Sequence, residues 1–101
     1  MQCPDFDPID PGETEVFGFD FSLALATDET ASGTLWDITL ASGVDATPAV
    51  RLSGVATLTG AVTAQRIAGA QSGAVYRLRA TIATSLGNTL SLWAYLRTSK
   101  F

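Results

Sequence analysis

The sequence predicts an all-β fold, arranged as a sandwich of six or seven short antiparallel strands. Over several segments apolar side chains alternate with polar ones, which is the period of a strand with one buried face. Clusters of Gly, Ser, Asp and Asn interrupt these segments about every 8–12 residues, as the turns of a sandwich do. Alanine is frequent, but no segment combines helical spacing with capping residues. A barrel is the alternative architecture.

The first 14 residues are predicted to form an extended acidic arm ahead of a domain over residues 15–101. The stretch MQCPDFDPIDPGET holds three of the four prolines of the chain. Proline fixes φ and removes a backbone donor, which excludes a helix or an interior strand. The arm is interpreted as a floppy terminus or as a segment that docks on a neighbouring chain. The docking residues would be Pro4, Asp5, Phe6, Asp7, Pro8, Ile9 and Asp10.

The first strand is predicted over residues 17–25, where five apolar side chains alternate with small or polar ones. These apolar residues are Phe17, Phe19, Phe21, Leu23 and Leu25. A second strand is predicted over residues 33–40, where Trp36, Ile38 and Leu40 alternate with polar side chains. Residues 49–67 are rich in Val and Thr and are expected to hold two or three short strands, broken at Gly54 and Gly60.

The last two strands, at about 75–84 and 89–98, are predicted to form a hairpin with apolar residues on both faces. The core face comprises Tyr76, Leu78, Ala80, Ile82, Leu90, Leu92, Ala94 and Leu96. The other face comprises Arg77, Arg79, Trp93, Tyr95 and Arg97. Keeping these faces together requires an odd number of loop residues, most simply 86–88 with Gly87 or Asn88 at positive φ.

This mixed face of the hairpin is the candidate partner-binding surface, because Trp, Tyr and Arg are enriched at interface hot spots. In one register Arg79 faces Tyr95; in the other, Arg79 faces Trp93 and Arg77 faces Tyr95. Either register stacks a guanidinium on an aromatic ring. The alternatives are that these residues only cover the sheet, that they pack beneath the N-terminal segment, or that the exposed aromatic rings bind a sugar.

The composition indicates one globular domain, with 47% hydrophobic and 16% charged residues. No apolar run approaches the ~18 residues of a membrane span, and the N-terminus lacks a secretory signal, so we expect a soluble chain without a membrane partner. All ten acidic residues precede residue 50 and all six basic ones follow it. This segregation indicates halves that neutralise each other or head-to-tail contact between copies. A nucleic-acid partner is not expected, since the basic residues form no run.

The residue types argue against catalysis and against a cofactor or metal. Histidine is absent, which removes the Ser-His and Cys-His nucleophiles and the commonest metal ligand. The spacing of Asp5, Asp7 and Asp10 matches no calcium-binding loop, and no glycine-rich stretch matches a phosphate-binding loop. A carboxylate pair held across a cleft is not expected in so small a domain. The lone Cys3 excludes an intrachain disulfide and is interpreted as an exposed thiol or as an intermolecular bridge.

The hairpin SGAVYRLRATIATSLGNTL is similar to the last hairpin of immunoglobulin-like domains, in which a tyrosine precedes a core strand. Leu78 stands where antibody domains place a cysteine, and Tyr76 is expected to act as a tyrosine corner, its hydroxyl bonding back to the preceding loop. Over residues 4–98 the order of the Asp-Pro-rich start, FDFS, DETASGTLW and this hairpin resembles small immunoglobulin-like proteins of tailed bacteriophages, some described as fibre–tail adaptors. The AGAQSG loop departs from the GG-containing loop of that group.

The resemblance implies an immunoglobulin-like sandwich without catalytic residues, present in the virion in several symmetric copies and made in the host bacterial cytoplasm. The leading hypothesis is an adaptor at the neck or tail that joins the head–tail connector to a fibre or spike. The first alternative is a capsid decoration protein, which would occur in hundreds of copies rather than about six or twelve. The second alternative is a carbohydrate-binding module for host glycans.

Overall fold

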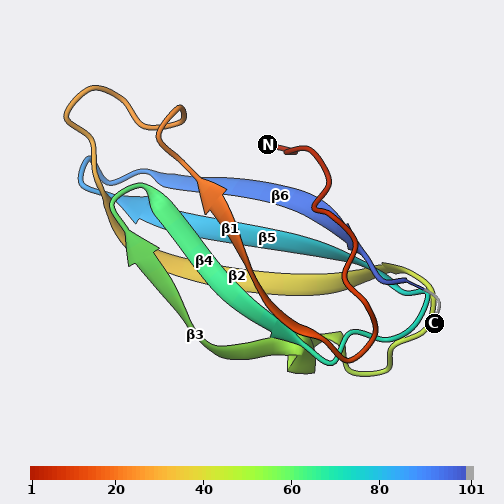
Figure 1. Cartoon of the computed structure of the whole chain (residues 1–101). Coiled ribbons are helices and arrows are strands. Elements are labelled where there is room, and N and C mark those ends of the chain that lie inside the picture. Colours follow the sequence, from red (N-terminus) through yellow and green to blue (C-terminus); the bar gives the residue numbers. More distant parts are fainter. Residues whose placement is uncertain (100–101) are drawn as a thin grey trace.

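The structure, a computed structural model, describes residues 1–99 and is a β-sandwich of two three-stranded antiparallel sheets (Figure 1). One sheet has the order β1-β4-β3 and the other β2-β5-β6. The strand bounds are Thr14–Asp20 for β1, Ala31–Ser42 for β2, Leu52–Thr59 for β3, Val62–Ala68 for β4, Val75–Thr84 for β5 and Thr89–Arg97 for β6. The prediction of an all-β antiparallel sandwich is confirmed, with six strands in the described residues.

The orders β1-β4-β3 and β2-β5-β6 correspond to strands B-E-D and C-F-G of constant-type immunoglobulin domains, which have a further strand, A, beside strand B. Trp36 on β2 is buried, as is the tryptophan on strand C of such domains. Its indole Nε1 donates to Thr63 Oγ1 at 2.8 Å, so the ring is buried with its polar atom bonded. The immunoglobulin-like assignment stays a prediction, and this strand order supports it.

The first strand differs from its predicted range. β1 ends at Asp20, because the Asp20 carboxylate accepts a hydrogen bond from Ser22 N at 2.9 Å and turns the chain. The backbone N–H groups of Ala24 and Leu25 then bond to Phe21 O. Phe21 stays in the core, but Leu23 is fully exposed. The prediction that the strand runs to residue 25 is therefore wrong.

The middle of the chain holds two strands and a short 3₁₀-helix, η1, at Pro48–Arg51. Gly60 separates β3 from β4, as predicted. Gly54, with φ of +75°, lies instead within β3, where the pairing to β4 shifts between Ser53 and Thr57. Gly54 therefore lies at an irregularity in the strand pairing rather than at a break between strands.

The hairpin of β5 and β6 keeps its two faces separate, as predicted. Thr84 N donates to Asn88 O, which leaves an odd number of residues, 85–87, in the turn, with Gly87 at φ of +81°. The turn is one residue earlier than the simplest loop predicted. The resulting register pairs Arg77 with Tyr95 and Arg79 with Trp93. The second of the two predicted registers is thus the one observed.

Candidate partner-binding face

The outer face of the β2-β5-β6 sheet is built from rows of residues that cross all three strands. Strand pairing aligns these rows, and each outward row is separated from the next by a core row. From one end of the sheet to the other, the outward rows are Gly33–Ala83–Thr89, Leu35–Thr81–Ser91, Asp37–Arg79–Trp93, Thr39–Arg77–Tyr95 and Ser42–Val75–Arg97. The face therefore changes from small and apolar residues to charged and aromatic ones.

The charged and aromatic rows form a connected cluster. The guanidinium of Arg77 lies over the indole ring of Trp93, 4.4 Å from its centroid. The Trp93 and Tyr95 rings meet edge to face at 5.4 Å. Arg77 contacts Trp93 diagonally rather than its directly paired residue, Tyr95. Such a cation–π contact contributes about 0.5–1 kcal/mol where it is exposed, so it orders the face more than it stabilises the fold.

Arg79 is paired with a residue that was not among those predicted for this face. Its Nε and Nη2 both lie 2.9 Å from Asp37 Oδ2 on β2. Both side chains are more than 40% exposed, so the pair contributes at most about 1 kcal/mol. The outward position of Asp37 in the predicted strand 33–40 was the available signal, but pairing of β2 with β5 is not encoded locally.

Arg97 lies at the end of β6 and is not part of this cluster. Its Nη2 is 3.7 Å from Asp5 Oδ2 in the N-terminal arm, and its side chain is 61% exposed. Of the five predicted partner-binding residues, the structure brings Arg77, Trp93 and Tyr95 into mutual contact, places Arg79 beside them and joins Arg97 to the arm.

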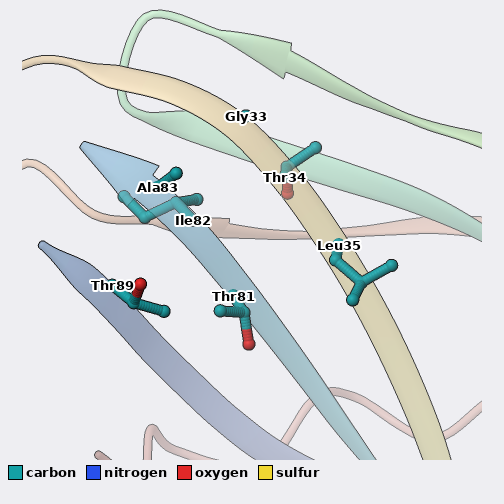
Figure 2. A pocket seen from close by; sticks show the side chains of 7 residues that line it. All are labelled: Gly33, Thr34, Leu35, Thr81, Ile82, Ala83 and Thr89. Carbon is teal, nitrogen blue, oxygen red and sulfur yellow. The ribbon is translucent and has the colours of Figure 1, made fainter. Parts of the chain in front are cut away.

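A shallow hollow of about 230 Å³ occupies the apolar end of the same face (Figure 2). Its lining includes Leu35, which is 69% exposed, together with Gly33, Ala83 and three threonines. Figure 2 shows these side chains coming from all three strands of the sheet. The hollow has no charged residue in its lining, which consists of small, aliphatic and threonine side chains.

The N-terminal arm lies against β6 of its own chain rather than free. It runs parallel to β6, with bridges from Gln2 to Trp93 and from Ile9 to Thr98. Ile9 is fully buried, and the Phe6 ring lies 5.0 Å from Phe17 and 5.2 Å from Phe19. The arm thus completes the core of the sandwich along one edge. The docking of this arm on a neighbouring chain stays a prediction, as does the division at residue 14; the last two residues of the predicted domain lie outside the described part.

The two charged halves of the sequence meet in the fold. The three ion pairs found in residues 1–99 each join an acidic residue from the first half to an arginine from the second. These pairs are Asp5–Arg97, Asp37–Arg79 and Asp45–Arg51. The segregation of charge along the sequence therefore becomes partial neutralisation between neighbouring strands and loops.

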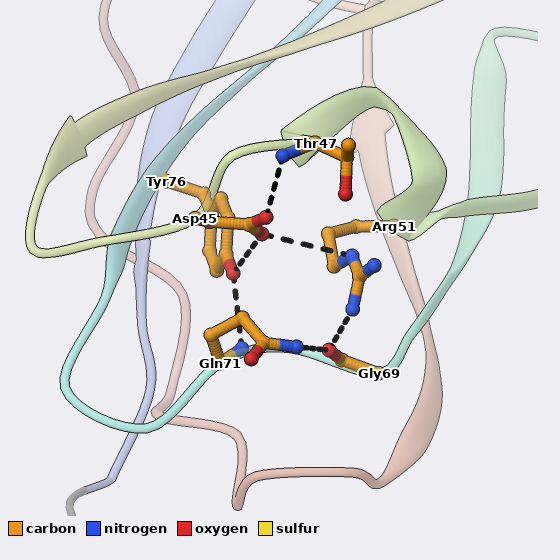
Figure 3. A network of polar contacts seen from close by, with 6 residues as sticks. All are labelled: Asp45, Thr47, Arg51, Gly69, Gln71 and Tyr76. Atoms are coloured by element: carbon orange, nitrogen blue, oxygen red, sulfur yellow. Dashed lines mark hydrogen bonds and ion pairs between the residues drawn. The ribbon is translucent and has the colours of Figure 1, made fainter.

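A buried polar network surrounds Tyr76 at the start of β5 (Figure 3). The Tyr76 hydroxyl donates to Asp45 Oδ2 at 2.7 Å and accepts from Gln71 N at 3.0 Å, which is the bond to the preceding loop expected of a tyrosine corner. Asp45 Oδ2 lies 3.7 Å from Arg51 Nε, and Arg51 donates to Gly69 O. The network ties the loop after β2 to the loop after β4.

Burial and hydrogen bonding set the proton affinities in this network. Burial raises the pKa of the Asp45 carboxyl, but the Tyr76 hydroxyl, Thr47 N–H and the Arg51 charge outweigh it, so the pKa lies below its ordinary value. Burial and the neighbouring Asp45 raise the pKa of Tyr76 to about 12. Tyr76 is therefore protonated at neutral pH and acts as a donor that holds a loop.

The opposite end of the sandwich is closed by Glu29. Its carboxylate accepts hydrogen bonds from Ala26 N, Thr84 Oγ1 and Asn88 Nδ2. The bond from the Ala26 backbone, followed by those from Thr84 and Asn88, holds the pKa of this carboxyl below its ordinary value. Glu29 thereby fastens the loop after β1 to the turn of the β5–β6 hairpin.

Within residues 1–99, no group of three or more acidic or cysteine side chains is placed to hold a metal ion. In the same residues, no helix has the length and apolar character needed to cross a membrane.

A family model described as "Podophage GP4 fiber-tail adaptor protein gp77" matches residues 10–97. The chain belongs to this podophage fibre–tail adaptor family. No curated protein and no solved structure gives a significant match. Membership confirms the resemblance to phage fibre–tail adaptors and implies a place in the virion, in contact with other virion proteins.

Proposed function

We propose that this fibre–tail adaptor protein joins the head–tail connector to a tail fibre, and that it does so by binding alone, without catalysis. The partner-binding face, defined as Arg77, Arg79, Trp93, Tyr95 and Arg97, supplies the contact to a neighbouring virion protein. The observation that carries this proposal is the ordered cluster of one guanidinium and two aromatic rings on the outer face of a sheet.

The chemistry of this face indicates what the partner presents. Arg79 and Arg97 already have carboxylate partners in the chain. Arg77 forms no ion pair among residues 1–99, and its buried Nε has no hydrogen-bond partner there. The guanidinium is therefore held by stacking and still has donors to offer. A partner carboxylate seated on Arg77, with an apolar side chain in the hollow by Leu35, would use both ends of the face.

The sugar-binding alternative is less favoured by this geometry. A sugar would stack on an open aromatic face, but the Arg77 guanidinium covers one face of Trp93, and Tyr95 meets the same ring edge to face. A capsid decoration protein is distinguishable by abundance, since an adaptor arranged in a symmetric ring would occur in about six or twelve copies per particle, and a decoration protein in hundreds.

The test replaces Arg77 by Glu together with Tyr95 by Ala and measures incorporation into phage particles. We expect incorporation to fall at least tenfold while circular dichroism and thermal unfolding of the purified chain stay near the wild type. Arg66→Glu is the matched control, because it makes the same change of charge on the outer face of the other sheet. Unchanged incorporation of the folded double variant would show that this face does not bind the partner.

A further inference from the structure

The N-terminal arm adds to the edge of β6 through a regular set of backbone hydrogen bonds. Cys3, Phe6 and Ile9 donate to the carbonyl groups of Trp93, Tyr95 and Arg97, at 2.7–3.0 Å. In return Trp93 N donates to Met1 O, and Ser99 N donates to Ile9 O. The odd-numbered residues of β6 thus direct their backbone groups at the arm, and the arm satisfies an edge that would otherwise be open.

Side chains reinforce this pairing. Ile9 is fully buried, and Phe6 packs on the two phenylalanines of β1 that line the core. Asp5 adds an ion pair to Arg97. The body therefore contains a groove, formed by the β6 edge and the Phe17 and Phe19 rings, that fits this arm sequence.

A single tight turn connects the arm to β1. Glu13 N bonds to Asp10 O, with Pro11 and Gly12 at the centre and Gly12 at φ of +80°, the arrangement of a type II turn. Asp10 N also donates to the Glu13 carboxylate, and Gly12 N donates to Ala70 O. These three bonds hold the arm in the groove of its own chain. Opening the turn breaks them and changes nothing in the groove.

We propose that the arm exchanges between copies, so that residues 1–9 of one chain fill the β6 groove of a second copy of the same chain. In the exchanged dimer, each contact of the arm is made with the other chain instead of its own, and only the turn at residues 10–13 is lost. Exchange is therefore a route to association that needs no new interface. An extended arm of nine residues spans about 30 Å. This length exceeds the two shorter dimensions of the molecule, 23 and 19 Å, so a released arm reaches beyond its own body.

The family match covers residues 10–97, so it includes both β1 and β6, which form the groove. The groove therefore lies within the matched region. The proposal concerns contact between copies and does not depend on which fibre or connector protein the adaptor binds.

The full-length chain contains a natural probe for the exchange. Cys3 and Ala94 directly follow the bridged pair Gln2 and Trp93 on parallel strands, so both side chains point toward the core. Neighbouring strands lie about 4.8 Å apart, within the Cα separation that a disulfide accepts. In the Ala94→Cys variant, oxidation links residues 3 and 94 within one chain when the arm is closed. It links two chains when the arm is exchanged.

The turn provides the means of shifting the equilibrium. Gly12→Ala strains the closed turn, since alanine at positive φ loses about 1 kcal/mol, and opening two turns relieves this strain in each dimer. We expect the dissociation constant of the dimer to fall about 30-fold, seen as more interchain disulfide on non-reducing gels. Gly60→Ala is the matched control: its φ is +60°, no atom stands within 4 Å of its added Cβ, and its turn joins β3 to β4.

Mixtures of isotopically light and heavy chains distinguish the outcomes. Mass spectrometry of peptides should find residue 3 of one isotope joined to residue 94 of the other, and more so in Gly12→Ala. Native mass spectrometry of chains with Ala94 intact provides a measurement that does not require the new cysteine. Intrachain links alone at every concentration, monomers in native spectra of Gly12→Ala, or an equal effect of Gly60→Ala would each overturn the proposal. If the chain is incorporated normally into particles but no exchange is detected, the exchange of the arm is refuted and the proposed function of joining a fibre to the connector is unaffected.

Discussion

Replacing Tyr76 by phenylalanine is expected to lower the free energy of unfolding by about 3 kcal/mol. The substitution keeps the fully buried ring and removes only the hydroxyl. Two hydrogen bonds are lost: one to the Asp45 carboxylate and one from Gln71 N. A bond to a charged group contributes about 1.5–3 kcal/mol and a bond between neutral groups about 0.5–1.5 kcal/mol, and the carboxylate is left buried without its main donor.

The measurement is chemical and thermal unfolding of the variant against the wild type. For a domain of this size a loss of ~3 kcal/mol lowers Tm by about 12–24 °C. Tyr95→Phe is the matched control, because the Tyr95 hydroxyl makes no hydrogen bond within residues 1–99 and lies on the outer face. The control is expected to change stability by less than ~0.5 kcal/mol.

Most of the expected loss comes from the contact between Tyr76 and Asp45, which a double-mutant cycle can isolate. Asp45→Ala and Tyr76→Phe should be non-additive by about 1 kcal/mol or more, since each substitution removes the same bond. If Tyr76→Phe costs no more than Tyr95→Phe, or if the two substitutions are additive, the corner does not hold the two loops as described.

Two further predictions concern pH. Because the folded pKa of Glu29 is lowered, its contribution to stability is full above the ordinary value of 4.5 and is lost as the pH falls through the folded pKa. Glu29→Gln should therefore lower Tm at pH 7, and its Tm difference from the wild type should shrink as the pH falls below 4.5; Asp28→Asn, in the same loop, is the control for a change of charge there. The raised pKa of Tyr76 affects stability at alkaline pH. The contribution of the Tyr76 hydroxyl to stability is full below pH 10 and is lost as the pH rises toward 12, so the Tm difference between the wild type and Tyr76→Phe should shrink over that range.

The strands could largely be predicted because the local alternation of apolar residues indicates which face of each strand is buried. The last hairpin shows this best: Leu78, Ala80 and Ile82 are fully buried at the predicted parity. The first strand shows the limit of the same signal. Leu23 continues the alternation of Phe17, Phe19 and Phe21, yet it is fully exposed because the Asp20 side chain turns the chain before it. A side-chain bond of this kind does not alter the apolar pattern.

The candidate face could be predicted as a set of residues but not as a set of contacts. The sequence of the hairpin allowed two registers. The position of the turn decides between them, because moving the turn by one residue changes which residues pair across β5 and β6. The partner of Arg79 comes from β2, more than 40 residues earlier, and the partner of Arg97 comes from the arm. Both pairings depend on which strands become neighbours, and this depends on the whole core rather than on any local segment.

The arm and the partner-binding face use different atoms of Trp93 and Tyr95, whereas both use the side chain of Arg97. Trp93, Tyr95 and Arg97 bond to the arm through their backbone groups, while the side chains of Trp93 and Tyr95 project onto the outer face. A partner seated on these side chains therefore leaves the arm bonds intact. The converse does not hold, because an arm that leaves the groove frees the β6 edge and removes Asp5 from Arg97. An arm supplied by a second copy would make the same bonds to β6 and hold this strand in place. Binding of a partner to the partner-binding face would then favour the exchanged state only if the bound surface includes residues of both copies.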